Sequence, residues 1–419
     1  MDRNTLFQLI DQRQDELFDL LSRLIRINSE NFGSYGNETE CPTYIAQVCR
    51  ELGLETSLYS PLELEGFTEH PDYWPGRHLE DRLNVTAVWK GLEDHNGLML
   101  MGHSDTETIG DPDLWTVDPL GGLIRDGKIW GRGANDDKFA IAVSLYLIKL
   151  LKELGFTPKK NILMTAYCDE EQGGSHGALA SALRYPSDVV INLDCDDFKI
   201  WNANSGGHCA MYRFHTDTTV DTCKRAADAL PIVLEEMEKF GERRREELRA
   251  NPHYAGTDIP EGGLRYFAVR AGGNGNDLNI GEIRYSIYTD KTKEEIDAEY
   301  AAMEAAVQAR LAPLGLISEG FRGTTRFFPY TCLDENAPSI AALKKAAMET
   351  SGRELQVCGS CLSDTSLLQK YNPGEVFAFG CGREFSVYGG AHQPDEFVEC
   401  DALVELTKIL GAFILDTLG

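Results

Sequence analysis

Short apolar runs alternate with amphipathic helical patterns along most of this chain, and that alternation limits the folds open to it. The strand-like runs cover 83–89, 98–103, 161–168, 189–193 and 376–379, and helical spacing of apolar residues covers 5–28, 139–154 and 402–418. Strands that alternate with helices imply a sheet wrapped by helices on both faces. We therefore predict an α/β fold with a mixed, largely parallel sheet.

The middle of the chain has a different pattern. Between about 207 and 318 a strand is followed by a long charged helix (221–249), two more strands (264–270 and 278–288) and a further helix (293–310). Strands that pair locally, with helices on one face, indicate a small α+β module. We predict an inserted lid domain at 207–318, with 1–206 and 319–419 together forming the main domain.

Composition excludes several classes of function. The formal net charge of −27 argues against a nucleic-acid partner, which needs clustered Lys and Arg. We find no apolar stretch long enough to cross a membrane and no signal-peptide pattern at the N-terminus. Eleven scattered cysteines fit reduced thiols better than a disulfide framework. We therefore expect a soluble cytoplasmic protein.

Residues that suit metal binding follow the ends of the predicted strands. They are His103 and Asp105 in GHSD, Asp136 in GRGANDDK, Glu170 and Glu171 in DEEQGG, Asp194 after VVINL, and His392 in GGAHQPDE. Each alone is ordinary, since a lone His is usually structural and an Asp before a helix is usually a cap. Together, the two histidines and three of these carboxylates, at the edge where α/β sheets bind ligands, suit zinc. A spare Glu beside a ligand Glu could then act as general base.

These motifs resemble those of a family of di-zinc hydrolases that includes aminoacylase, carboxypeptidase G, succinyl-diaminopimelate desuccinylase and bacterial dipeptidases. The matching pieces are GHSDT at 102–106, WGRGANDDK at 130–138, DEEQGG at 169–174, INLD at 191–194, LNIGEIRY at 278–285 and GGAHQPDE at 389–396. They occur in the family's order and cover nearly the whole chain. The resemblance implies a zinc-exopeptidase-like catalytic domain that cleaves an amide bond.

The resemblance also implies a role for each residue. His103 and Asp194 would bind one zinc, Glu171 and His392 would bind the other, and Asp136 would bridge both. Asp105 would orient His103, and Glu170 would be the general base. The resemblance thus implies two Zn²⁺ per subunit, with Co²⁺ or Mn²⁺ as possible substitutes.

The lid departs from the family pattern. Many members have a histidine after the first lid strand that stabilises the oxyanion, but here the corresponding stretch, 211–216, is shortened. His215 is the nearest candidate, with His208 and His253 as alternatives.

The lid's length resembles that of dimeric relatives, so we expect a homodimer through the lid, paired along an exposed edge strand such as Leu278–Tyr288.

The choice of substrate stays open between two classes. Asp194 and the run Asp136-Asp137-Lys138 resemble the dipeptidase members, which favours a small-peptide substrate. An N-acyl or N-carbamoyl amino acid is the second choice. A hypothesis from another class is that the chain is an inactive relative that acts as a binding module. Loss of a metal ligand or of the general base would favour it, but the five expected ligands and Glu170 are all present.

Overall fold

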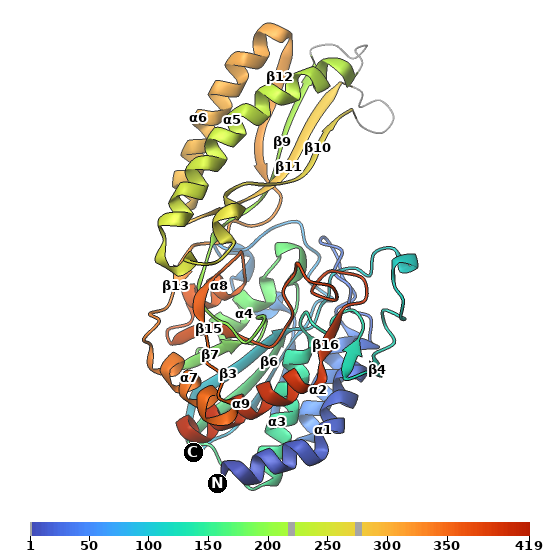
Figure 1. Cartoon of the computed structure of the whole chain (residues 1–419), viewed down its shortest axis with the longest axis vertical. Coiled ribbons are helices and arrows are strands. Elements are labelled where there is room, and N and C mark those ends of the chain that lie inside the picture. Colours follow the sequence, from blue (N-terminus) through green and yellow to red (C-terminus); the bar gives the residue numbers. More distant parts are fainter. Residues whose placement is uncertain (1, 217–222, 273–278) are drawn as a thin grey trace. The chain divides into compact units, whose positions relative to one another are not determined.

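The computed structural model describes residues 2–216, 223–272 and 279–419, and the chain divides into two compact units (Figure 1). The main unit comprises Met1–Asn202, Leu333–Val357 and Leu367–Gly419. The inserted unit comprises Ala203–Cys332 and Cys358–Ser366. The stretch 207–318, expected from the sequence to form the insertion, lies inside the longer part of the inserted unit.

The main unit is built on a mixed sheet. Its central strands run parallel to one another and its outer strands are antiparallel to their neighbours. In spatial order they are β1 (Glu55–Tyr59), β2 (Asn84–Trp89), β6 (Lys160–Tyr167), β3 (Glu93–His103), β7 (Val189–Asn192), β15 (Glu375–Phe379), β8 (Ile200–Asn204) and the short β13 (Thr331–Cys332). A further short strand, β14 (Val357–Ser360), also pairs with β8. The predicted α/β fold class is confirmed. A small second sheet contains β16 (Phe397–Glu399), β5 (Lys128–Trp130) and β4 (Leu123–Arg125).

Helices cover both faces of the main sheet. Leu98 and Leu100 of β3 point into the larger core, whereas Met99 and Met101 point into a separate core on the opposite face. Burial of both faces explains why this strand reads as a continuous apolar run. The larger core contains α1 (Arg3–Ile25), α2 (Glu40–Glu51), α3 (Lys138–Glu153), α7 (Pro338–Ser351) and α9 (Cys400–Leu418); the other contains α4 (His176–Arg184) and α8 (Thr365–Tyr371).

The inserted unit is an antiparallel sheet with two long helices packed on it. Tyr212 and Phe214 are buried against these helices, while the alternate residues Arg213 and His215 belong to the opposite face. This period-2 alternation is that of a sheet covered on one side. Its elements are β9 (Gly206–Thr216), α5 (Cys223–Ala250), β10 (Arg265–Ala271), β11 (Ile280–Thr289), α6 (Lys293–Leu311) and β12 (Leu316–Gly323).

The strand expected at the edge of the inserted sheet is an interior strand, so that expectation is wrong. The strand order is β10-β11-β9-β12, which places β11 between two partners. The sequence pattern marks a strand but does not reveal strand order, because pairing depends on segments far apart in the chain. β10 and β12 are the outer strands among the described residues. Leu278, the expected first residue of the strand, lies outside the described residues.

Candidate metal centre

The site begins with His103, the last residue of β3, whose side chain is fully buried. Its Nδ1–H donates to the backbone carbonyl of Asp105 at 2.9 Å. This bond leaves Nε2 as the ring atom available to a metal, since a ligating histidine usually donates its other N–H to a carbonyl or carboxylate. Nε2 lies 2.8 Å from Oδ1 of Asp136.

Asp105 acts mainly on the loop that follows β6. Its carboxylate accepts the backbone N–H groups of Glu170 at 3.2 Å and Glu171 at 3.0 Å, and the side-chain amide of Asn31 at 2.9 Å. One carboxylate oxygen also lies 3.8 Å from Nδ1 of His103. Asp105 therefore contacts the His103 ring through its carbonyl and holds the two glutamates through its carboxylate.

Asp136 connects the two histidines. Its Oδ1 contacts His103, and its Oδ2 lies 3.2 Å from Nε2 of His392. The backbone before α3 is held by Glu396, which accepts the N–H groups of Asn135 at 2.7 Å and Asp136 at 3.1 Å. Since Glu396 belongs to the GGAHQPDE motif, this contact joins the second motif to the last one. A single carboxylate that faces both histidines has the geometry of a bridging ligand.

Glu171 lies on the other side of Asp136. Its Oε2 is 3.0 Å from Nε2 of His392, and its Oε1 accepts the backbone N–H of Glu107 at 2.6 Å. Glu170, the preceding residue, is half-buried, and its charge contributes to raising the pKa of His103. Glu170 thus lies near the His103 side of the centre without belonging to either group of potential ligands.

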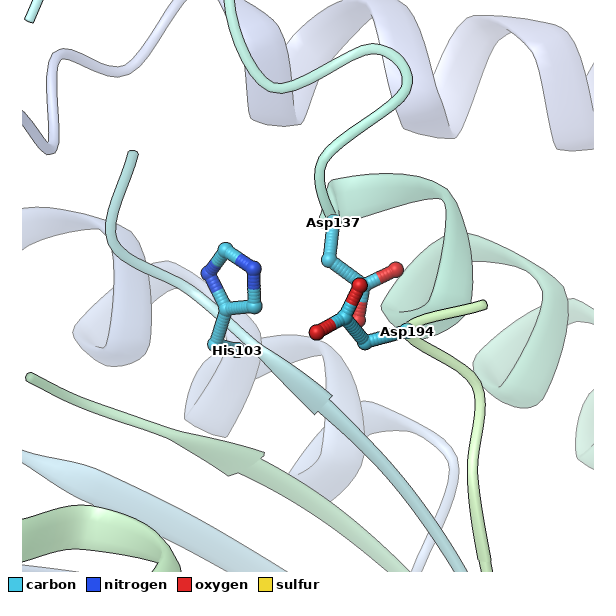
Figure 2. A group of neighbouring side chains, drawn as sticks. All are labelled: His103, Asp137 and Asp194. Carbon is cyan, nitrogen blue, oxygen red and sulfur yellow. The ribbon is translucent and has the colours of Figure 1, made fainter. Parts of the chain in front are cut away.

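The potential ligand atoms fall into two groups on the described residues. In the first, which Figure 2 draws, the side chains of His103, Asp137 and Asp194 lie close together. One potential ligand atom of each lies within 4.8 Å of the others. In the second, the same holds for Glu107, Glu171 and His392. Four of these six residues are among those predicted from the sequence, and the other two, Asp137 and Glu107, are not. Each missed residue lies one or two positions after a named one, but adjacency alone does not reveal which side chain turns inward.

Burial and mutual charge shift several pKa values. Burial would raise the pKa of Asp136, but hydrogen bonds from His103 and His392 hold it below its usual range. Burial raises the pKa of Glu171 to about 7, against the opposing charge of His392. Burial would lower the pKa of His392, but Glu171 and Asp136 raise it to about 11. Without a metal, protonated histidines thus supply the positive charge that the carboxylates require, and a divalent cation would replace it.

Asp169, the first acid of DEEQGG, has a structural role. Its buried carboxylate accepts from Arg77 at 2.6 Å, from Arg82 and from His176. Three adjacent acids at the end of an apolar strand are costly unless positive charge compensates them. Two buried arginine side chains compensate this carboxylate, whereas Glu171 contacts His392 and the charge of Glu170 acts on His103.

The candidate histidines of the inserted unit differ in their surroundings. Nδ1 of His215 lies 3.2 Å from Glu319 on the neighbouring strand β12. His208 is buried; its Nε2 is 2.9 Å from the Tyr300 hydroxyl, and its ring packs against Tyr300 and Phe327. His208 therefore belongs to the packing of this unit. His253 lies in a short 3-10 helix, Pro252–Tyr254.

The helices and the cysteines were also considered in the predictions from the sequence. Among the helices of the described residues, none combines the length and the apolar character needed to cross a bilayer. All eleven cysteines are described and none forms a disulfide.

Sequence comparisons identify related proteins along almost the whole chain. An uncharacterized metallohydrolase of Methanocaldococcus jannaschii is 26% identical over 445 aligned positions, which cover 94% of this chain and 98% of that protein. The N-formyl-4-amino-5-aminomethyl-2-methylpyrimidine deformylase of Halalkalibacterium halodurans is 23% identical, covering 97% of this chain and 95% of that protein.

Solved structures show the same fold. Human carnosine dipeptidase 1 superposes with a TM-score of 0.73 at 17% identity, and the di-peptidase Dug1p of Saccharomyces cerevisiae with 0.76 at 16%. Both comparisons cover 99% of this chain and 98% of the other. The model of peptidase family M20/M25/M40 matches residues 99–416, well over half of the chain. With the two histidine–carboxylate groups described above, these matches establish that the chain is a metallohydrolase belonging to peptidase family M20/M25/M40.

Proposed function

We propose that this protein uses two metal ions to hydrolyse the amide bond of a small peptide. The observation that carries the proposal is the contact of one carboxylate, Asp136, with both His103 and His392. His103 and Asp194 would hold one zinc ion, and Glu171 and His392 the other, with Asp136 shared. The donor set fits, because imidazole and carboxylate groups bind zinc, and Co²⁺ or Mn²⁺ also accept them.

The reaction divides between the metals and the protein. Bound metals would lower the pKa of a water and polarise the substrate carbonyl. Glu170 takes the proton from the attacking water and returns it to the leaving amine, as a general base and then a general acid. Asp105 keeps Glu170 in place through the backbone N–H of that residue. His215 remains our first choice for a donor to the oxyanion.

The substrate class is the finer part of the proposal. Asp194 and the run Asp136-Asp137-Lys138 favour a dipeptide, because these residues resemble those of the dipeptidase members of the family. The second candidate is an N-acyl or N-carbamoyl amino-acid amidohydrolase, which the full-length similarity to a deformylase favours. Both reactions hydrolyse an amide, so the same centre serves either one.

A substrate panel separates the two classes. The metal-loaded protein is incubated with dipeptides that have a free amino group and with N-formyl, N-acetyl, N-succinyl and N-carbamoyl amino acids, and released amine is measured. We expect dipeptides to give the highest kcat/KM. Preference for an acylated substrate would select the deacylase. Hydrolysis of no member, with two metals bound, would favour an inactive relative that serves as a binding module.

We also propose that the inserted unit acts as a lid and mediates a homodimer. Its strand β10, which is an outer strand among the described residues, exposes two large apolar side chains, Phe267 (62%) and Val269 (44%). An exposed strand edge of this kind is a natural pairing surface. Light scattering at micromolar concentration should give the mass of a dimer. A monomer mass would refute the dimer without affecting the hydrolase proposal.

A further inference from the structure

Each of the two ligand groups contains one carboxylate to which the family resemblance assigns no role. Asp137 belongs to the group with His103 and Asp194, and Glu107 to the group with Glu171 and His392. We propose that Asp137 and Glu107 are metal ligands, one at each metal position. The inference rests on the two-metal site proposed above and extends its ligand set.

Asp137 is the stronger case because its carboxylate is buried beside that of Asp194, with His103 as the neighbour that offsets their charge. The residue is fully buried, and neither carboxylate oxygen has a hydrogen-bond partner among the described residues. Figure 2 shows the carboxylates of Asp137 and Asp194 lying together beside the ring of His103. Two carboxylates taken out of water and placed side by side are costly unless a cation compensates them.

The fold around Asp137 directs this carboxylate toward the centre. It lies against Gly102 of β3, where an added Cβ would come within 2.8 Å of Oδ2 of Asp137. Glycine at position 102 therefore leaves the space that the carboxylate occupies, one residue before the ligand His103. A side chain packed there only to fill volume would be apolar, because burying an unpaired carboxylate costs free energy.

Glu107 is joined to Glu171 in two ways. Its backbone N–H donates to Glu171 at 2.6 Å, and its carboxylate lies in the same ligand group. The Glu107 carboxylate in turn accepts the backbone N–H of Thr108 at 2.9 Å and the side-chain amide of Gln172. Ligating carboxylates are commonly held by such outer hydrogen bonds. The arrangement thus presents an oriented carboxylate beside Glu171 and His392.

The extended set makes both positions rich in oxygen. The first would have His103, Asp137 and Asp194, the second His392, Glu107 and Glu171, and both would share Asp136. One nitrogen with three carboxylates suits a cation such as Mn²⁺, which prefers oxygen ligands and accepts a higher coordination number than zinc. Mn²⁺ is therefore the probe for the test.

The test measures Mn²⁺ affinity directly. Metal-free wild type, Asp137→Asn and Glu107→Gln are titrated with Mn²⁺ by calorimetry, and bound metal is counted after dialysis. Exposed acids of the main unit provide matched controls, Asp81→Asn and Glu65→Gln. We expect two sites in the wild type and in both controls. Each test variant should lose at least about 10-fold in affinity at one of the two sites and keep the other, since even outer partners of ligands alter affinity 10- to 100-fold.

Thermal unfolding separates a ligand from a purely structural side chain. Without metal, Asp137→Asn should unfold at the same temperature as the wild type or higher, because it removes one of two adjacent carboxylates. With Mn²⁺ its gain in Tm should be smaller than that of the wild type. If Asp137→Asn does not fold, Asp137→Ser is measured in the same way. Unchanged affinity at both sites, or an equal loss of Tm with and without Mn²⁺, would overturn the proposal for that residue. Absence of hydrolysis with normal Mn²⁺ binding would instead count against the proposed function alone.

Discussion

The two units differ in how they treat buried charge. In the inserted unit Arg244 pairs with Glu299 at 3.0 Å, and Glu282 pairs with Arg270 at 2.7 Å, so opposite charges meet. The main unit also contains such pairs, as between Asp169 and Arg82, but around two of its histidines carboxylates gather beside one another. A fold keeps like charges buried together where a cation compensates them. We infer from this difference that the metal chemistry belongs to the main unit. The charged pairs of the inserted unit instead stabilise that unit.

The largest expected effect separates the two adjacent glutamates of the main unit. Glu170→Gln should lower kcat by about 10²–10⁴-fold, the usual cost of losing a general base, while both metals stay bound. Glu171→Gln, its neighbour, should instead lower the metal content. Activity assays and metal analysis of both variants make the comparison. Near-normal turnover of Glu170→Gln would exclude Glu170 as the base.

A second effect tests whether the inserted unit contributes to chemistry at all. His215→Ala should lower turnover by about 10²–10³-fold, as loss of an oxyanion donor does, with unchanged metal content. Glu319→Gln is the control, because it weakens the 3.2 Å pair and keeps the imidazole ring. If His215→Ala is fully active, His253 and His208 are tested next. Full activity of all three variants would confine catalysis to the main unit.

The third effect concerns stability in the main unit. Asp169→Asn removes the carboxylate partner of the buried Arg77 and one of two carboxylate partners of Arg82, the other being Glu38 at 3.3 Å. Leaving such charges uncompensated should lower the free energy of unfolding by about 3–5 kcal/mol. Asp188→Asn, which breaks a more exposed pair with Lys160, should cost under about 1 kcal/mol. Urea unfolding measures both, and equal losses would contradict a structural role for Asp169.

The smallest effect is a pH dependence of the inserted unit. Burial lowers the pKa of His208 to about 4, whereas an unfolded histidine titrates near pH 6.5. The unfolded chain therefore binds the extra proton first, and the free energy of unfolding falls as the pH drops from about 6.5 to about 4, by about 3 kcal/mol in all. His208→Phe keeps an aromatic ring and should flatten this slope. Parallel pH curves for the wild type and the variant would show that His208 does not titrate in this way.

Sequence patterns predicted the features that depend on neighbouring residues. The apolar runs of the parallel strands and the motifs after them are local, so the fold class and the meeting of His103, Asp136, Glu171, Asp194 and His392 could be anticipated. The position of β11 inside its sheet depends on long-range pairing, and its prediction as an edge was wrong. Asp137 and Glu107 were missed because their inward direction depends on neighbours such as Gly102 and Gln172. Asp169 looked like its neighbours in sequence and differs only through the distant Arg77 and Arg82.

Anomalous diffraction from metal-loaded crystals tests the central claim most directly. With Mn²⁺ or Zn²⁺ bound and data collected above the absorption edge of the metal, we expect two peaks about 3.5–4 Å apart, the usual separation in two-metal sites. One peak should lie next to His103 and the other next to His392, with the Asp136 carboxylate between them. A single peak, or two peaks that do not share Asp136, would contradict the account.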